Sequence, residues 1–337
     1  MHIFHEVFAF VQAWYWIPLL LLYLGVISTI LIENRNPTKT LSWVLVIVFL
    51  PFVGLICYYL FGQKFVKVKR IKRVNHAQAI RLKKEWQNLE PYMEKDIAEI
   101  RAKIGNLSRV FSFLKNERLS SPTIGNDVKL LINGEQKFPA FKQSLKAAKH
   151  SIHIEYYIFE LDVIGLELLN VLEERAHSGV QVRLLVDSFG SPDMVRYMQQ
   201  HPETKIDFRA FMPVTFTSLA NSNYRNHRKI AVVDGEIGFV GGINISDRYI
   251  NKPDAAGSAR YWRDTSVMIA GPAVNMLQIG FWNSWNLADG RPFLLSDGYL
   301  RSIPTKEKKG HAATSFVSSD PGSIGPYNME AILIAIG

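Results

Sequence analysis

Residues 226–244 read NHRKIAVVDGEIGFVGGIN, and this stretch predicts a β-hairpin. Its first half is rich in β-branched residues, Asp234-Gly235 is a turn signal, and its second half supplies a return strand. Because side chains alternate along a strand, His227 and Lys229 are expected to project from the same face. An imidazole can attack phosphorus, and a neighbouring ammonium can hold the phosphoryl oxygens as charge develops. The stretch therefore predicts a site for phosphate chemistry.

The spacing of these residues resembles the HxKxxxxD motif of the phospholipase D superfamily, with His227, Lys229 and Asp234 on the three motif positions. The glycine pair 241–242 and Asn244 resemble the Gly-(Gly/Ser)-x-Asn that follows this motif. The resemblance implies that His227 is a nucleophile or an acid/base, that Lys229 binds phosphate and that Asp234 orients an imidazole, at some distance. Asn244 either donates hydrogen bonds to phosphate oxygens, which the motif favours, or holds the hairpin. A surface hairpin with incidental charge is the alternative, and the trailing residues disfavour it.

Further polar residues are candidates for the same site. Glu155, His153 and Tyr157 share one face of a predicted strand, and Glu155 is predicted to contact substrate, although a half-exposed strand shows the same alternation. Asp187 ends a strand, where α/β sites gather, or it caps the next element. Asp264, in WRDT, resembles a family position at a strand start, and a turn acid is an equal alternative.

The chain has 337 residues and carries 39 Lys+Arg against 30 Asp+Glu. This length suffices for a large core and for more than one unit. The basic balance favours an anionic partner such as acidic lipid, nucleic acid or a phosphorylated substrate, although a general solubility bias gives the same balance. The only cysteine, Cys57, lies in an apolar run, which excludes an intramolecular disulfide and a cysteine-based metal site.

Two apolar runs near the N-terminus, 14–32 and 41–61, carry no charge and are about long enough to cross a bilayer. The polar segment between them contains Pro37, which breaks a continuous helix. These runs predict a two-span transmembrane helical hairpin in residues 1–62. A cleaved signal peptide is disfavoured because no basic stretch precedes the first run, and a buried soluble helix pair is the other alternative.

Basic residues predict how such a hairpin is oriented. Residues 64–73 hold six Lys and Arg, whereas the inter-span turn holds two. The positive-inside tendency then places both termini and the following domain in the cytoplasm, at the cell membrane. The basic cluster would lie against anionic head groups. Residues 63–120 are predicted to be a basic helical linker, interrupted near Pro91 and Gly105.

From residue 121 onward, short β-rich runs alternate with amphipathic helical ones, which predicts an α/β domain over 121–303 with a largely parallel sheet. Residues 304–337 begin with a charged linker and then repeat the order of a short strand, a polar loop and an amphipathic helix. This order predicts the truncated start of a second such domain. No second HxKxxxxD occurs in the chain. Covalent phosphoryl transfer needs a nucleophile and a separate acid/base, so the chain is expected to be incomplete or to share a site between copies.

Taken with the apolar runs, these motifs resemble the bacterial cardiolipin synthases of the phospholipase D superfamily. The resemblance implies an α/β/α sandwich domain and transfer of a phosphatidyl group between two phosphatidylglycerol molecules through a phosphohistidine-type intermediate, with glycerol released. It implies no metal and no cofactor, and partners that are phosphatidylglycerol and anionic membrane lipid, without nucleic acid. A homo-oligomer is left open. Two alternatives remain: a phosphodiesterase that uses water as acceptor, and a non-catalytic membrane-bound lipid-binding remnant. The chain alone is expected to be weakly active or inactive.

Overall fold

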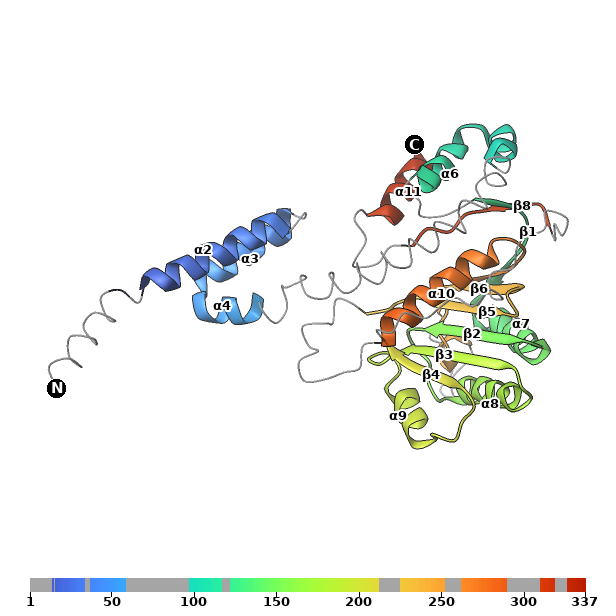
Figure 1. Cartoon of the computed structure of the whole chain (residues 1–337). Coiled ribbons are helices and arrows are strands. Elements are labelled where there is room, and N and C mark those ends of the chain that lie inside the picture. Colours follow the sequence, from blue (N-terminus) through green and yellow to red (C-terminus); the bar gives the residue numbers. More distant parts are fainter. Residues whose placement is uncertain are drawn as a thin grey trace. The chain divides into compact units, whose positions relative to one another are not determined.

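The computed structural model describes residues 14, 16–33, 37–58, 97–116, 122–211, 225–251, 262–289, 310–318 and 326–337. The chain divides into two compact units, a helical N-terminal unit and a larger α/β unit (Figure 1). The predicted basic cluster at 64–73 and the predicted break near Pro91 lie outside the described residues.

The N-terminal unit contains helices α2 (Trp16–Glu33), α3 (Pro37–Phe49) and α4 (Pro51–Cys57). Within the apolar run predicted over 41–61, the chain bends at Leu50 and a new helix, α4, begins at Pro51. Proline lacks the N–H that a helix interior needs but fits a first turn. Among the described helices, none combines the length and the apolar composition that crossing a bilayer requires, in contrast to the two predicted spans.

Within the described part of the α/β unit, eight strands form one sheet in the order β4-β3-β2-β5-β6-β7-β1-β8. The strands are β1 (Thr123–Ile132), β2 (Ser151–Tyr156), β3 (Gln181–Asp187), β4 (Asp207–Phe211), β5 (Lys229–Val233), β6 (Ile237–Gly241), β7 (Thr265–Ala270) and β8 (Ala312–Thr314). The helices are α6 (Ser108–Asn116), α7 (Asn133–Ala147), α8 (Val163–His177), α9 (Pro192–Gln200), α10 (Val274–Asp289) and α11 (Tyr327–Ile336), with short 3-10 turns η2 (Gly105–Leu107) and η4 (Asp247–Tyr249).

The sheet is mixed, which corrects the prediction of a largely parallel one. Only the pairs β2–β3 and β3–β4 are parallel among the described strands. All the other pairs are antiparallel. Alternation of strands and helices predicts parallel pairs only where a helix crosses over between neighbours. The 226–244 hairpin places its first strand antiparallel to β2, and from β2 to β8 each strand runs opposite to its neighbour.

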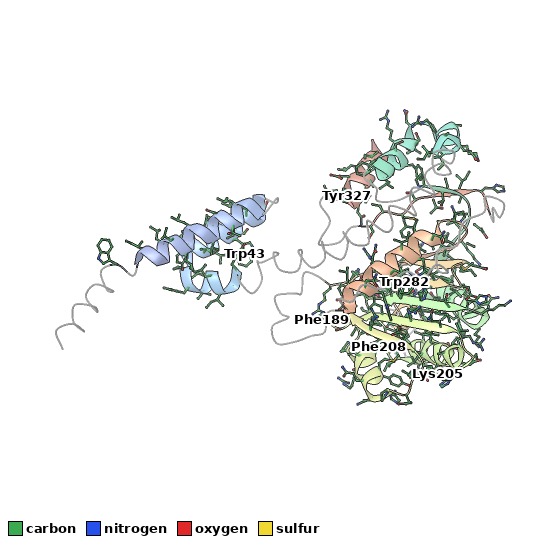
Figure 2. The ribbon with its side chains drawn as sticks, in the orientation of Figure 1. Trp43, Phe189, Lys205, Phe208, Trp282 and Tyr327 are labelled. Carbon is green, nitrogen blue, oxygen red and sulfur yellow. The ribbon has the colours of Figure 1, made fainter. Side chains whose placement is uncertain are left out.

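Helices cover both faces of the sheet, as an α/β/α sandwich requires. Helices α7 and α8 pack on one face, over a core that includes Phe141, Leu168 and Phe239. Helix α10 packs on the other face, where Trp282 (labelled in Figure 2) and Trp285 are buried, and the Trp282 ring lies 5.0 Å from that of His153 on β2. Each buried aromatic side chain removes roughly 150–250 Å² from water, so these rings contribute strongly to the stability of the unit.

The predicted hairpin is confirmed as strands β5 and β6. Asp234 and Gly235 both have positive φ, at 53° and 66°, and the N–H of Glu236 donates to the carbonyl of Val233. These dihedrals fit the two-residue turn that the right-handed twist of a hairpin favours. Alternation along β5 is also as predicted: Ala231 and Val233 join the core under α7 and α8, whereas Ile230 and Val232 face α10.

The C-terminal residues form a strand and a helix, as predicted. Strand β8 pairs with β1 at the edge of the same sheet, and α11 packs against α6. Asn126 ties β8 to β1, because its buried amide donates to the carbonyl of Ala312 at 3.2 Å and to that of Thr123 at 3.1 Å. The start of the predicted second repeat therefore adds to the first sheet.

Candidate active site

His227 and Lys229 lie together at the beginning of β5. Nζ of Lys229 is 3.0 Å from Nδ1 of His227 and donates to the carbonyl oxygen of His227 at 2.8 Å. The Tyr157 ring lies 4.6 Å from the imidazole and 5.3 Å from the Lys229 ammonium. The imidazole is exposed, whereas Lys229 is buried. An accessible imidazole thus lies beside a buried amine that is held in place.

Both groups have shifted pKa values. Burial lowers the pKa of Lys229 to about 8, and the carboxylate of Asp264 opposes that shift. Burial also lowers the pKa of His227, with a further lowering from Lys229 and an opposing effect of Asp187. At neutral pH this combination favours a neutral imidazole beside a cationic amine, which are the forms that nucleophilic attack and charge stabilisation require.

Asp187 ends β3 and is buried within reach of this site. Its carboxylate accepts from the N–H groups of Phe189 at 2.9 Å and Asn226 at 3.2 Å. The Arg225 guanidinium lies 3.7 Å away. Burial raises the pKa of Asp187, and these N–H groups and Arg225 oppose that shift. Asp187 therefore fixes the backbone just before His227.

Glu155 differs from the predicted substrate contact. Its carboxylate is fully buried and accepts a hydrogen bond from Nδ2 of Asn226 at 2.6 Å. Burial raises the pKa of this carboxyl group, and Arg228 opposes the shift. The side chain lies on the α10 face, opposite the face that carries Lys229, because Glu155 and Tyr156 alternate along β2. The position suits a residue that supports Asn226, the neighbour of His227 in the chain.

Asp234 lies at the far end of β5 from His227. Its carboxylate accepts three backbone N–H groups, from Lys149 at 2.8 Å, His150 at 2.7 Å and Ser151 at 2.8 Å. Asp234 is seven positions after His227, which corresponds to about 23 Å along an extended chain. The structure does not bring these two motif positions together within this chain. Here Asp234 anchors the start of β2 to the hairpin turn.

Asn244 lies in the loop that follows β6 and is almost fully buried. Its amide group donates to the Tyr249 hydroxyl at 2.6 Å, and its side-chain oxygen accepts from the N–H of Ile158 at 3.2 Å. One amide hydrogen is thus engaged within the protein. These contacts match the hairpin-holding alternative more closely than the phosphate-binding one.

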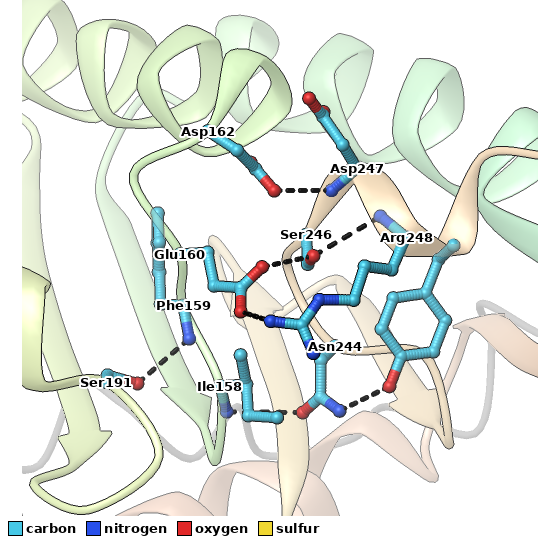
Figure 3. Close-up of polar contacts among 10 residues, drawn as sticks. Ile158, Phe159, Glu160, Asp162, Ser191, Asn244, Ser246, Asp247 and Arg248 are labelled. Carbon is cyan, nitrogen blue, oxygen red and sulfur yellow. Dashed lines mark hydrogen bonds and ion pairs between the residues drawn. The ribbon is translucent and has the colours of Figure 1, made fainter. Parts of the chain in front are cut away.

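A reciprocal network fixes this loop against the start of α8 (Figure 3). Asp162 accepts from the N–H of Asp247 at 2.6 Å, while Asp247 accepts from the N–H of Ile164 at 2.9 Å. Ser246 and Arg248 both donate to the carboxylate of Glu160. Carboxylates at a helix N-terminus satisfy donors that have no partner within the helix. The backbone around Asn244 is therefore held from several sides.

Asp264 precedes β7 and approaches the glycine pair. Its Oδ1 accepts from the N–H of Thr265 at 2.6 Å, and its own N–H donates to Asn133 at 3.0 Å. A Cβ at Gly242 would collide with this carboxylate. The second glycine of the motif therefore leaves room for the Asp264 carboxylate.

His153 is not part of the exposed site. It is fully buried on the α10 face, stacked on Phe281 at 4.9 Å, with Nδ1 3.1 Å from Gln278. Burial lowers its pKa to about 4, so the ring is neutral. Two further residues, which the sequence analysis did not single out, are Asn226, bonded to Glu155, and Lys137, bonded to the backbone of Ile243. In the part of the chain that the structure describes, no group of three or more His, Cys, Asp and Glu side chains could hold a metal ion.

Comparison with known proteins relates this site to one family. Residues 141–259 match the family described as cardiolipin synthase, PLD-like domain, and residues 20–63 match phospholipase D-nuclease N-terminal. A cardiolipin synthase of Alkalihalophilus pseudofirmus is 34% identical over 311 residues, covering 92% of this chain and 60% of that protein. One of Geobacillus thermodenitrificans is 36% identical over 294 residues, covering 86% of this chain and 56% of that protein.

Among solved structures, NucT from Helicobacter pylori is 13% identical, with a TM-score of 0.38, covering 48% of this chain and 96% of that chain. The chain spans about three fifths of the length of the curated relatives that it matches. Residues 141–259 are thus similar to the phospholipase D-like domain of cardiolipin synthases, and most of the chain is similar to proteins named cardiolipin synthase.

Proposed function

We propose that this chain carries the His–Lys half of a phosphatidyltransferase site that makes cardiolipin from two phosphatidylglycerol molecules and releases glycerol. The observation that supports it most directly is the 3.0 Å approach of the Lys229 ammonium to the exposed His227 imidazole. The identity of this chain to proteins named cardiolipin synthase agrees with that chemistry.

In the proposed reaction, an imidazole nitrogen of His227 attacks the phosphorus of one phosphatidylglycerol. A nitrogen–phosphorus bond forms, the bond to the glycerol oxygen breaks, and a proton from a second acid/base converts the leaving alkoxide to glycerol. The primary hydroxyl of a second phosphatidylglycerol then attacks the phosphorus, gives up its proton to the same base and frees His227. Lys229 holds the phosphoryl oxygens as negative charge develops.

The second acid/base has to come from outside the motif. The 337 residues contain one HxKxxxxD, so a second imidazole would be supplied by another copy or by additional polypeptide. Asp234 is assigned an anchoring role, because its carboxylate is engaged by three backbone N–H groups. Glu155 and Asn244 are assigned supporting roles, since both side chains are buried and bonded within the protein.

A lipid assay tests this proposal. The chain is mixed with phosphatidylglycerol micelles, alone and with a protein segment that bears a second HxKxxxxD motif, and both cardiolipin and glycerol are measured. Cardiolipin formation that is weak alone, stronger in the mixture and lost in His227→Ala supports the proposal. Lys146→Ala, an exposed lysine on α7, is the matched control. Substantial cardiolipin formation by His227→Ala contradicts it.

Two alternatives are separated by the same assay. Release of phosphatidic acid without cardiolipin identifies a hydrolase that uses water as acceptor, which the exposure of His227 permits. Binding of phosphatidylglycerol vesicles without any turnover, alone or in the mixture, identifies a lipid-binding protein. The single motif favours this last outcome over the hydrolase, because hydrolysis also needs a separate acid/base.

The N-terminal unit is proposed to hold the protein at the membrane, with the α/β unit on the cytoplasmic side. Its helices expose large apolar side chains, including Leu21, Leu41, Phe49 and Phe52. Large exposed apolar side chains on these helices favour contact with an apolar partner such as lipid. Binding to phosphatidylglycerol vesicles should fall at least about tenfold in Phe49→Asp/Phe52→Asp, because each phenyl group contributes about 1.5–3 kcal/mol when buried. Leu107→Asp, at an exposed leucine of the α/β unit, is the control.

A further inference from the structure

Lys137 on α7 is a fully buried lysine outside the motif. Its Nζ donates to the carbonyl oxygen of Ile243 at 2.9 Å and to that of Asn244 at 3.3 Å. The rings of Phe138, Phe141 and Tyr156 lie 4.9, 5.6 and 4.6 Å from the same nitrogen. Burying a charge is costly unless it is paired or hydrogen-bonded.

The surroundings of Lys137 fit a cation. Carbonyl oxygens and the faces of aromatic rings accept hydrogen bonds or attract positive charge, and neither can donate a proton. Burial lowers the pKa of Lys137, and the Asp264 carboxylate opposes that shift. The same carboxylate opposes the shift of Lys229. The negative charge of Asp264 therefore favours the protonated forms of both Lys137 and Lys229.

Lys137 lies close to the His227–Lys229 pair. Its Nζ is 4.6 Å from the ring of Tyr156, and Tyr156 pairs with Lys229 where β2 meets β5. The carbonyls that Lys137 holds belong to the loop that follows β6, the strand paired with β5. The loop has two further backbone bonds, from the N–H of Gly242 to Thr265 at 3.0 Å and from that of Ile245 to Ile158 at 3.1 Å.

We propose that Lys137 is a positioning residue of the phosphate site, whose ammonium, enclosed by three rings, holds the carbonyls of Ile243 and Asn244 and so fixes the loop that follows β6. It acts through that backbone, without touching the substrate. This inference rests on the proposed phosphate chemistry of His227 and Lys229.

The test uses the full chain and inorganic vanadate, a phosphate analogue, as the probe. Three proteins are compared with the unsubstituted chain: Lys137→Met removes the ammonium at similar volume, Lys137→Arg keeps the charge, and Lys146→Met removes an exposed lysine from the same helix. Vanadate affinity is measured by calorimetry, and amide hydrogen exchange is followed at Gly242 and Ile245. His227→Ala is included to show that vanadate reports on the site.

In Lys137→Met, vanadate is expected to bind about tenfold more weakly, and the two loop amides to exchange at least about tenfold faster, because two buried carbonyls lose their donor. Amides of β3 should keep their exchange rates. Lys137→Arg should recover part of the affinity, and Lys146→Met should match the unsubstituted chain. If Lys137→Met does not fold, the side-chain NMR signal of Lys137 in the unsubstituted chain takes its place. That signal should shift on vanadate titration with the same Kd as the signal of Lys229, while the signal of Lys146 stays fixed.

The outcomes separate the two claims. Vanadate binding that is equal in His227→Ala and in the unsubstituted chain refutes the proposed function and, with it, this inference. Binding that depends on His227 but is unchanged in folded Lys137→Met refutes the inference alone. The inference is also refuted if the amides of Gly242 and Ile245 exchange at an unchanged rate in Lys137→Met. It is refuted as well if the NMR signal of Lys137 does not shift when vanadate is added.

Discussion

The ammonium of Lys229 lies 3.0 Å from Nδ1 of His227 and donates at 2.8 Å to the carbonyl oxygen of the same residue. The lysine is buried and the histidine is exposed. Lys229 therefore places an amine beside the imidazole, while the imidazole of His227 remains accessible from solvent. This division follows from the strand, because position 229 lies within β5 and position 227 lies just before it.

The pH dependence of vanadate binding, or of transfer in the mixed assay, should be bell-shaped. His227 must be neutral to attack, and its pKa is lowered from 6.5, so activity should rise with pH through a value below 6.5. Lys229 must be protonated to hold phosphate, so activity should fall as pH rises through about 8. Titration of initial rates across this window checks both limbs. A falling limb that persists unchanged in Lys229→Arg would assign it to another group, since arginine stays protonated.

Lys229→Met should reduce transfer by about 10²–10³, because a positioned charge that stabilises a developing anion contributes on that scale. The substitution also removes a buried charge, so the fold should tolerate it. The comparison is made in kcat, with thermal unfolding measured on the same samples. A loss in kcat that matched only a loss of folded protein would contradict the assignment.

Asp234→Ala should lower the free energy of unfolding by about 3 kcal/mol, because three backbone N–H groups would lose a charged acceptor. Asp234 also has a φ of 53°, which alanine tolerates poorly. Asp234→Asn keeps both the conformation and one acceptor oxygen, so it should be milder. Urea unfolding measures the loss. Vanadate affinity per folded molecule should stay the same in both variants, and a selective loss of affinity would place Asp234 in the site.

Gly242→Ala and Gly280→Ala form a matched pair. At position 242 a Cβ would collide with the Asp264 carboxylate, whereas at position 280 it would lie 3.6 Å from Ile230, an ordinary contact. Gly242→Ala should therefore displace Asp264 and weaken vanadate binding about tenfold or more. Gly280→Ala lies inside α10 and should stabilise the protein by up to about 1 kcal/mol. Equal affinities in the two variants would show that the approach of Asp264 is not needed.

Glu155→Gln should keep vanadate affinity within a few-fold, because its side-chain oxygen can still accept from Asn226. Glu155→Ala should weaken binding about tenfold and also lower the melting temperature, since Asn226 loses its partner and a cavity opens. Calorimetry on both variants distinguishes this supporting role from a direct contact. A direct contact would make Glu155→Gln as defective as Glu155→Ala.

Local features of the chain were predictable from the sequence. The hairpin follows from β-branched residues around Asp234-Gly235, and the shared face of His227 and Lys229 follows from the alternation along a strand. The strand–helix order up to β4 and the end of α8 near Gly179 follow in the same way. Each of these depends on residues close together in the chain, which periodicity and turn chemistry describe.

Tertiary structure alone decided the partners of these residues. Asp234 meets the backbone of residues 149–151, more than 80 positions away, and Lys137 meets Ile243, 106 positions away. The sequence did carry one signal for Lys137, which shares an apolar helix face with Phe141 and Leu145 at four-residue spacing. That spacing does not predict that Lys137 contacts Ile243, because the order and direction of strands in the sheet determine which distant segments come together. The same order made the sheet mixed and brought β8 beside β1, and neither follows from local alternation.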